Sequence, residues 1–313
     1  MQVAPARLHD LIDMPQSPVT TAWYSVLGAS FAVVSDVAEA LLQVDETYTA
    51  FRAAPGALDQ AIVLRLQRIP TEAAFLVSDS TDGIVTNGRA RRWPAYQDAL
   101  LDLFDRLVHA LLARLLSQGL YAIHAGAAVY RGGALMLAGR SGQGKTTLTL
   151  GLLRRGLGLL SDEFAVVEPV ARQVVPYHRS LHVRPGTLDL IPELGFLRER
   201  PRQQMGGGSE WAVAPRDLER SLPGCLAQAA PLRYILLLDG TPHTDTRPTI
   251  TAAPAALTAL ELLRGTWAAS VDFAGALTSI SKLLENVPCA RLQVGALEPT
   301  LDMVLSWLEA SSG

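Results

Sequence analysis

The spacing of apolar and polar residues along the chain predicts an alternation of short strands and helices. Residues 20–34 are rich in β-branched and aromatic side chains and predict one or two strands. An apolar stripe with helical spacing predicts a helix over 37–49, and strict alternation predicts a half-buried strand over 62–67. The dipeptide at 82–83, Asp-Gly between two apolar segments, is a hairpin signal. We therefore expect a small N-terminal α+β module over residues 1–95.

A long amphipathic helix is predicted next, over residues 96–117. Its apolar side chains form one wide face, as in a helix that packs against a core; they are Leu100, Leu101, Phe104, Leu107, Val108, Leu111, Leu112 and Leu115. Gly119 supplies a signal for the end of the helix. We place the start of a second domain, residues 96–313, at this helix.

The second domain opens with two strands joined by a tight turn. Residues 121–130 read as a strand, Gly132 and Gly133 form the turn, and the apolar run 134–138 is the next strand. Strands joined by so short a turn must be antiparallel. The strand 134–138 therefore does not lie in an all-parallel sheet, which argues against the usual GTPase and ABC layouts and favours an NTPase with a mixed sheet.

A glycine-rich loop follows this strand directly. Residues 139–147 match the P-loop pattern G-x-x-x-x-G-K-[ST] at every fixed position and lead into the apolar helix 148–153. In such a loop, backbone N–H groups turn inward around a phosphate, and the helix behind them directs the positive end of its dipole at the same anion. Lys145 would lie along the β- and γ-phosphates of ATP, and the Thr146 hydroxyl would bind Mg²⁺. The residues predicted to hold the nucleotide are Gly139, Ser141, Gly142, Gln143, Gly144, Lys145, Thr146 and Thr147.

Two aspartates are candidates for the carboxylate that acts at the γ-phosphate, on its Mg²⁺ or on the attacking nucleophile. Asp162 follows the short apolar strand 157–160, where it would meet the γ-phosphate, its Mg²⁺ or the attacking nucleophile. We predict Asp162 as the leading catalytic residue and, with Thr146, as a metal ligand. Asp239, at the end of the apolar strand 234–238, is the alternative for the metal. A cap or turn aspartate is the structural alternative for both residues.

Basic and titratable side chains gather in residues 178–184. Alternation along a strand would place His178, Ser180, His182 and Arg184 on one face. We predict Arg184 as a cation that neutralises phosphate charge in the transition state, with a surface or structural ion pair as its alternative. His182 is a further candidate, as a general base.

The rest of the second domain gives weaker signals. The polar and glycine-rich stretch 197–212 predicts a long loop, either a functional lid or a disordered segment. The remaining elements that the pattern predicts are a strand over 233–238, helices over 255–263 and 273–285, a strand over 290–294 and a helix over 299–309.

Composition limits the partners of the chain. The net charge of −3 and the pI near 6.1 provide no overall positive field for nucleic acid or anionic lipid, so we expect neither as a partner. No window approaches the 18 or so uninterrupted apolar residues of a membrane span, and the first residues do not form a signal peptide. Only Cys225 and Cys289 occur, which fits a reducing compartment. We therefore expect a cytoplasmic protein.

Several of these segments together resemble a known family. They are His-Ala-Gly-Ala-Ala-Val at 124–129, the Gly-Gly turn at 132–133, the loop region 137–148, Arg-Gly at 155–156, Leu-Ser-Asp-Glu at 160–163 and Val-Pro-Cys-Ala-Arg-Leu at 287–292. They resemble the nucleotide core of HPr kinase/phosphorylase, and in particular the HPr kinase-related proteins of peptide-modification systems, including lasso peptide kinases. The resemblance implies an α/β fold whose P-loop NTPase core has the mixed sheet shared with ATP-dependent phosphoenolpyruvate carboxykinase.

The resemblance also implies roles for individual residues. Lys145 would contact the phosphates, Thr146 would bind Mg²⁺, and Asp162 would activate the acceptor hydroxyl. His124 matches a histidine that lies near the phosphate site in the family; from the sequence alone it reads equally well as a core histidine. The chain departs from the family at Glu163, where a second Asp is frequent, and it lacks the downstream arginine- and glycine-rich signature that serves HPr binding and dephosphorylation.

These observations predict a Mg-ATP-dependent kinase that transfers the γ-phosphoryl group to a hydroxyl, with a serine of a peptide or protein as the favoured acceptor. A small-molecule kinase on the same core is one alternative. A nucleotide-binding switch without phosphotransfer is another; its partner surface would be the N-terminal module with the basic cluster Arg89, Arg91 and Arg92. Relatives of this fold often form hexamers, which makes a homo-oligomer a further expectation.

Overall fold

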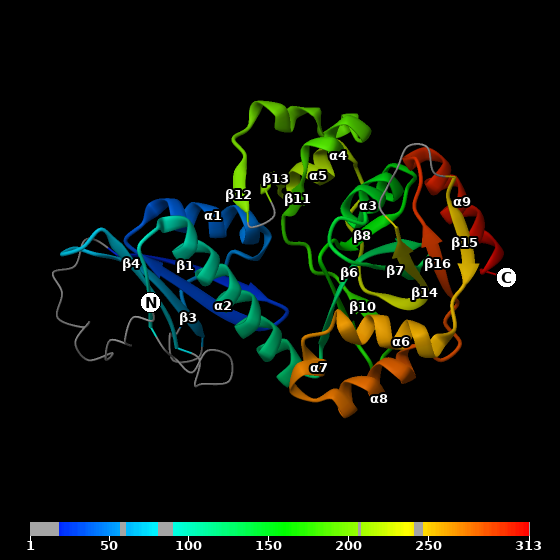
Figure 1. Ribbon diagram of the computed structural model, residues 1–313, viewed down its shortest axis with the longest axis horizontal. Coiled ribbons are helices and arrows are strands. Elements are labelled where there is room, and N and C mark those ends of the chain that lie inside the picture. Colours follow the sequence, from blue (N-terminus) through cyan, green and yellow to red (C-terminus); the bar gives the residue numbers. More distant parts are fainter. Residues whose placement is uncertain (1–18, 57–60, 81–89, 206–207, 241–246, 313) are drawn as a thin grey trace. The chain divides into compact units, whose positions relative to one another are not determined.

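The chain folds as an α/β protein with several sheets, of which two mix parallel and antiparallel strands (Figure 1). The computed structural model describes residues 19–56, 61–80, 90–205, 208–240 and 247–312. These residues form two compact units. The first extends to Ser117 and includes Met205; the second comprises residues 118–204 and 208–313.

The first unit is built on a five-stranded sheet of order β1-β2-β3-β4-β5. Helix α1 connects β2 to β3, and these two strands are parallel, whereas the other neighbours in this sheet are antiparallel. The segment 20–34, predicted to hold one or two strands, holds two, and the helix and strand predicted after it are confirmed. The hairpin signal at 82–83 lies outside the described residues. The elements are β1 (Thr20–Val26), β2 (Ala29–Ser35), α1 (Ala38–Tyr48), a 3₁₀ turn (Thr49–Phe51), β3 (Ile62–Ile69), β4 (Ala74–Asp79), β5 (Arg91–Trp93) and α2 (Tyr96–Ser117).

Helix α2 has the bounds that the sequence predicts, but it belongs to the first unit, so the boundary lies after residue 117 and not after residue 95. Its apolar face packs on β3 and β4. The buried Arg106 side chain fixes this packing, because its Nη1 lies 2.7 Å from Asp79 Oδ2 and its Nε lies 3.1 Å from Asp102 Oδ1. A wide apolar stripe shows that a helix is buried, but it does not show against which sheet.

The basic cluster near residue 90 is engaged within this unit. Arg91 lies over the ring of Trp93, 5.7 Å from its centroid, and also pairs with Asp102. Arg92 pairs with Glu72. Arg89, the third member, lies outside the described residues. These contacts match the surface ion pairs that are common on soluble proteins.

The second unit is built on a larger mixed sheet with the strand order β10-β9-β6-β7-β14-β16-β15, in which β8 also pairs with β6. Strands β6 and β7 are antiparallel, with Ala125 opposite Ala138, and β7 is parallel to β14. The predicted mixed arrangement around the strand before the glycine loop is thus confirmed. The strands are β6 (Tyr121–Tyr130), β7 (Gly133–Ala138), β8 (Gly158–Ser161), β9 (Phe164–Glu168), β10 (Gln173–Val175), β14 (Ala230–Asp239), β15 (Thr249–Ala252) and β16 (Cys289–Gln293).

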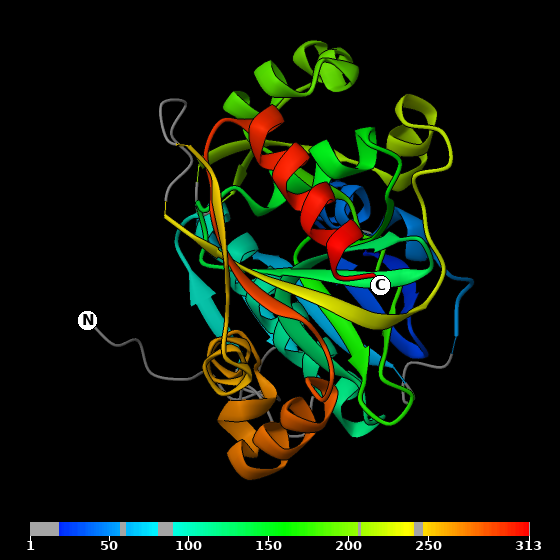
Figure 2. The same ribbon diagram turned by 90° about the vertical axis from the view of Figure 1, so that its right-hand side faces the viewer.

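A small sheet of order β11-β13-β12 and several helices complete the second unit. The stretch 197–212 is not the long loop that its composition suggests, because most of it forms a 3₁₀ helix and two paired strands. Helices α6, α7 and α8 form a group of their own, away from α3 and α9 (Figures 1 and 2). The elements are α3 (Lys145–Arg154), β11 (Leu181–Val183), α4 (Pro185–Leu190), a 3₁₀ helix (Pro192–Glu199), β12 (Gln203–Met205), β13 (Gly208–Val213), α5 (Pro215–Ser221), α6 (Ala255–Arg264), α7 (Ala268–Val271), α8 (Phe273–Leu283) and α9 (Leu297–Ala310).

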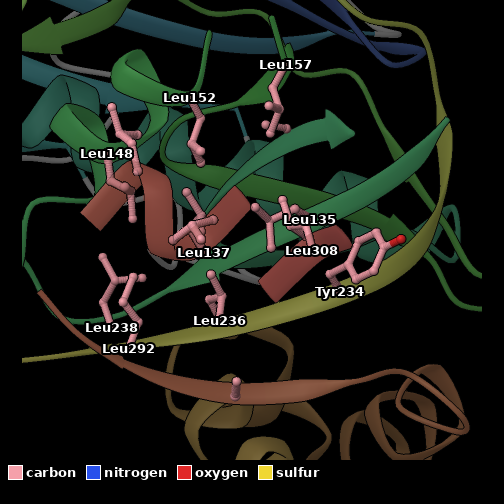
Figure 3. Packing of buried hydrophobic residues seen from close by; sticks show 14 of the residues in the cluster. Leu135, Leu137, Leu148, Leu152, Leu157, Tyr234, Leu236, Leu238, Leu292 and Leu308 are labelled. Carbon is pink, nitrogen blue, oxygen red and sulfur yellow. The ribbon is translucent and has the colours of Figure 1, made fainter. Parts of the chain in front are cut away.

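One apolar core holds the glycine loop and its helix in place. Alternate residues of β7, β14 and β16 point to the same face of the sheet, where α3 and α9 cover them. Figure 3 shows these side chains directed toward one another; they include Leu135, Leu137, Leu148, Leu152, Tyr234, Leu236, Leu238, Leu292 and Leu308. The loop therefore connects two elements that the core fixes independently.

The close approach of β6 to α3 requires a glycine at position 126. A Cβ on Gly126 would lie 2.8 Å from Thr149 Oγ1, and Thr149 is fully buried. We expect Gly126→Ala to destabilise the protein by about 1–3 kcal/mol through overpacking. Because Thr149→Ala removes the atom in conflict, the double variant should recover most of this loss, as measured by denaturant unfolding of both single variants and the pair. Additive effects would show that the contact is not tight.

Candidate functional site

The glycine loop, residues 139–147, has a backbone that only glycine adopts easily. Gly142 and Gly144 both have φ of +84°, a left-handed conformation that side chains disfavour. Gly139 is restricted for a different reason: a Cβ there would lie 2.7 Å from Gln143 Oε1 and 3.0 Å from Leu238 Cβ. The loop geometry therefore needs the two glycines of the sequence pattern, Gly139 and Gly144, and also Gly142 at a variable position of that pattern.

Two side chains fold back onto the loop. Gln143 Oε1 accepts a hydrogen bond from the backbone N–H of Arg140 at 2.5 Å. Lys145 Nζ donates to the carbonyl oxygens of Gly139 at 2.7 Å and Arg140 at 3.1 Å. Lys145 is mostly buried, and burial lowers its pKa, against the opposing effect of the nearby carboxylates. The loop thus holds a partly buried cation at its centre.

Helix α3 starts directly at this cation. Its N-cap is Gly144, and among the described residues no side chain caps its first turn. The first N–H groups of a helix have no partner within the helix and attract anions. The Thr147 side chain is hydrogen-bonded to another helix, because its hydroxyl lies 2.8 Å from that of Thr187 in α4. Ser141 lies exposed on the loop. Together, the open helix end and Lys145 suit a phosphate group.

Asp162 lies where the sequence predicts, beside the end of the loop. Strands β7 and β8 both run antiparallel to β6, so their C-terminal ends meet at one edge of the sheet. Thr146 Oγ1 donates a hydrogen bond of 2.9 Å to Asp162 Oδ2. The other oxygen, Oδ1, is buried without a partner among the described residues. Burial raises the pKa of Asp162 from 3.8 to about 6.

Glu163 and His124 join Asp162 at this edge. The backbone carbonyl of Glu163 accepts a hydrogen bond from Ala125 N at 3.1 Å, which links the turn to β6. His124, the preceding residue in β6, donates its backbone N–H to Gly265 O at 2.7 Å, and its ring meets the edge of Phe164. Burial and the Lys145 charge lower the pKa of the His124 imidazole, so this ring is neutral at pH 7.

The two candidate carboxylates differ in their surroundings. Asp239 lies at the end of β14, next to the strand that enters the loop, but its side chain is 53% exposed. Its Oδ2 lies 3.2 Å from Arg291 Nη1 and its Oδ1 accepts from Gly240 N. Asp162 instead contacts Thr146 directly. The geometry therefore favours Asp162 over Asp239 as the carboxylate that works with Thr146.

The basic segment 178–184 is arranged differently from the predicted single face. Only residues 181–183 form a strand, and His178 precedes it, with Nε2 2.8 Å from Leu159 O. Arg184 is bound to Glu210, with 2.8 Å between Nε and Oε1, and its side chain is half exposed. The structure thus shows Arg184 in an ion pair with Glu210.

A different arginine lies at the carboxylate turn, one that the sequence did not single out. Arg179 forms an ion pair with Glu163, and its side chain is only 10% exposed. Its charge also lowers the pKa of Asp162, although burial outweighs this effect. Arg179 was visible in the sequence as part of the basic segment. Alternation from residue 178 would favour Arg184, but the strand begins only at Leu181.

The oxygen atoms near the loop suit a hard divalent cation. Asp162 Oδ1 is a buried carboxylate oxygen that has no partner in the part of the chain that the structure describes. The Thr146 hydroxyl lies beside Oδ2 of the same side chain. The described residues contain no group of three or more His, Cys, Asp and Glu placed to hold a metal. Mg²⁺ does not need such a group, because it is usually bound by one or two protein ligands together with substrate phosphates and water.

The raised pKa of Asp162 predicts an effect on stability. A carboxyl group whose pKa rises on folding stabilises the protein below its unfolded pKa of 3.8, and this contribution is lost as pH rises through about 6. Asp162→Asn, which can still accept from Thr146, should therefore stabilise the nucleotide-free protein in EDTA at pH 7, by up to about 3 kcal/mol. Denaturant unfolding between pH 4 and 7 measures this. A less stable variant at pH 7 would show that the ionised carboxylate supports the fold.

Comparison with known proteins adds little to these observations. No protein-family model matches the sequence, and no curated protein matches it significantly. Among solved structures, the Hpr(Ser) kinase/phosphatase from Coxiella burnetii is similar, with 10% sequence identity and a TM-score of 0.30; the match covers 61% of this chain and 99% of that chain. A likeness at this TM-score says nothing of function, so the chain's own residues must carry the argument. None of the helices in the described ranges is long and apolar enough to cross a membrane.

Proposed function

We propose that this protein is a Mg-ATP-dependent kinase that transfers the γ-phosphoryl group to a hydroxyl, with a serine of a peptide or protein as the acceptor. The observation that carries the proposal is the hydrogen bond between Thr146 Oγ1 and Asp162 Oδ2. It joins the end of the glycine loop to a buried carboxylate, at the place where phosphoryl transfer needs a metal ligand and an acceptor-orienting group side by side.

Each residue of the site has a role in this proposal. On binding ATP, Lys145 Nζ exchanges the carbonyls of Gly139 and Arg140 for phosphate oxygens, which become its stronger, charge-assisted partners. The N–H groups of residues 142–147 and the start of α3 surround the phosphates. Neutral His124 lies beside Lys145 and donates or accepts one hydrogen bond at the phosphate side without adding charge.

Asp162 acts on the acceptor. Its Oδ1 has no other partner among the described residues, so it is available to accept the hydrogen bond of the incoming hydroxyl. As the bond between the acceptor oxygen and the γ-phosphorus forms and the bond to the ADP oxygen breaks, the hydroxyl proton passes to Oδ1. A pKa of about 6 leaves the carboxylate mostly ionised at pH 7 and still basic enough for this transfer.

Thr146 and Asp162 would hold Mg²⁺, which supplies neutralisation of phosphate charge when bound. Arg184, the predicted transition-state cation, would first have to leave Glu210. Arg179 lies closer to the carboxylate turn through its ion pair with Glu163. The resemblance of residues 121–165 to HPr kinase-like proteins supports the choice of serine over other hydroxyls.

The proposal is tested by mass spectrometry of a library of short serine peptides after incubation with Mg-ATP and the protein. We expect a phosphate adduct on a subset of peptides, and none with the Lys145→Ala variant. A variant at the alternative carboxylate, Asp239→Ala, should still give the adducts. If ATP is bound and slowly hydrolysed but neither peptides nor small hydroxyl compounds gain phosphate, the kinase proposal is wrong and a nucleotide-dependent switch takes its place.

A further inference from the structure

His182, a largely buried histidine on the small sheet, has no hydrogen-bond partner for its ring among the described residues. In β11, Leu181 and Val183 are buried in an apolar core cluster, so His182 between them points to the opposite face. The register places His182 opposite Ala212 of β13. Two residues away from this pair, Arg184 and Glu210 lie on the same side and form an ion pair.

The ring of His182 lacks the hydrogen bonds that a buried imidazole requires. Its side chain is 11% exposed, and neither Nδ1 nor Nε2 has a hydrogen-bond partner among the described residues. The nearest carboxylate oxygen, Glu210 Oε2, is 3.9 Å from Nδ1, which is too long for a hydrogen bond. Glu210 is bound to Arg184 instead. Buried polar atoms without partners are rare in folded proteins and need an explanation.

His182 also lies close to the carboxylate turn. Burial raises the pKa of Glu163, but the Arg179 charge lowers that pKa, and the imidazole of His182 is among the further groups close enough to Glu163 to affect it. Glu163 is the residue after Asp162, and Asp162 accepts the hydrogen bond of the acceptor hydroxyl in our proposal. A group bound to His182 would therefore lie on the Glu163 side of the carboxylate turn.

The surroundings of His182 favour a neutral, polar ligand. Its two acidic neighbours are each neutralised by an arginine, Glu163 by Arg179 and Glu210 by Arg184, so no net charge remains for an ionic group. Burial lowers the pKa of His182 to about 4, so the ring is neutral at pH 7 and offers one donor and one acceptor. A main-chain amide, which carries both an acceptor and a donor, matches this pair.

We propose that His182 determines acceptor specificity: its imidazole hydrogen-bonds a main-chain amide of a peptide acceptor, next to the hydroxyl that Asp162 receives. This inference rests on the proposed kinase function. Arg184, two residues along from His182, has a long side chain that is 50% exposed, so this side of the sheet is reached from solvent near His182. In addition, β11 is an edge strand of its sheet within the described residues, which leaves its other side to an extended chain.

The test compares phosphorylation of the best substrate in the serine-peptide library by three variants. His182→Phe keeps the ring shape without the nitrogens and should raise KM for the peptide about tenfold, the loss of one buried hydrogen bond. KM for ATP and peptide-independent ATP hydrolysis should not change. His182→Gln should recover part of the loss. His178→Phe is the matched control, because that ring has a backbone partner; it should leave KM for the peptide unchanged.

A second readout does not depend on turnover. Nitrogen NMR of the imidazole groups should show the His182 signals, identified by their loss in His182→Gln, shifting on addition of the library peptide. An unchanged KM in His182→Phe, or an equal rise in His178→Phe, would overturn the inference. Transfer to free serine or glycerol but to no peptide would overturn it and leave the kinase intact. Absence of transfer to every acceptor would instead refute the kinase proposal and this inference with it.

Discussion

Replacement of Lys145 by alanine is expected to lower kcat/KM for phosphoryl transfer about a thousandfold. The side chain is the cation at the centre of the glycine loop, and its Nζ already lies among the backbone carbonyls of the loop. Loss of a preorganised charge from a partly buried site removes stabilisation that solvent cannot replace. The fold should persist, because the core that surrounds α3 and β7 does not use this side chain.

The composition of the chain offers an internal control for this prediction. Lys145 and Lys282 are the only lysines in the sequence, and all other permanently cationic side chains are arginines. An acyl-phosphate derivative of ATP, which acylates lysines near bound phosphates, should therefore modify Lys145, and excess Mg-ATP should protect it. Lys282, on the exposed surface of α8, should react slowly and without protection. Equal labelling of both lysines would contradict a nucleotide at the loop.

Asp162→Ala is expected to reduce kcat about 10²–10⁴-fold while the affinity for ATP changes far less. The carboxylate serves the acceptor proton, whereas most nucleotide contacts come from the loop backbone and Lys145. Single-turnover transfer and nucleotide binding by calorimetry separate the two effects. Asp239→Ala is the matched control, since Asp239 ends a neighbouring strand but pairs with Arg291; its turnover should stay within a few-fold of wild type.

The opposite pattern would reassign the carboxylates. If Asp162→Ala weakened ATP binding but kept turnover at saturating ATP, Asp162 would serve the nucleotide alone and not the acceptor. If Asp239→Ala caused the larger loss of turnover, Asp239, at the end of β14, would be the carboxylate that binds the metal and orients the acceptor.

Local signals predicted the elements on which the site rests. The turn at Gly132-Gly133 fixed the antiparallel pairing of β6 and β7, because so few residues cannot connect parallel strands. The glycine loop was predicted between a strand and a helix, and it lies between β7 and α3, with left-handed backbone at Gly142 and Gly144. Asp162 was predicted at the end of a strand beside the loop, and its hydrogen bond to Thr146 follows from that place in the sheet. The roles of these residues in binding and catalysis stay predictions.

Contacts that depend on distant packing were not predictable. Helix α2 has clear bounds in the sequence, yet the sheet it covers depends on Arg106 and its buried partners. Residues 178–180 do not belong to β11, so the alternation of a strand does not apply to them. The prediction from alternation therefore chose Arg184, whereas Arg179 is the arginine that pairs with Glu163 at the carboxylate turn. The glycines near residue 207 suggested a loop, although the strands on both sides pair through backbone groups that composition does not reveal.

Transfer of a radiolabel from ATP tests the central claim most directly. The protein is mixed in excess with ATP labelled on the γ-phosphate, Mg²⁺ and the best library peptide, and the label is followed for a single turnover. The account predicts that the γ-label moves from ATP to the peptide serine. In a parallel reaction with ATP labelled on the α-phosphate, the label should stay with ADP. Lys145→Ala should show neither loss of ATP nor labelled peptide. Label released only as free phosphate, at the same rate with and without peptide, would contradict it.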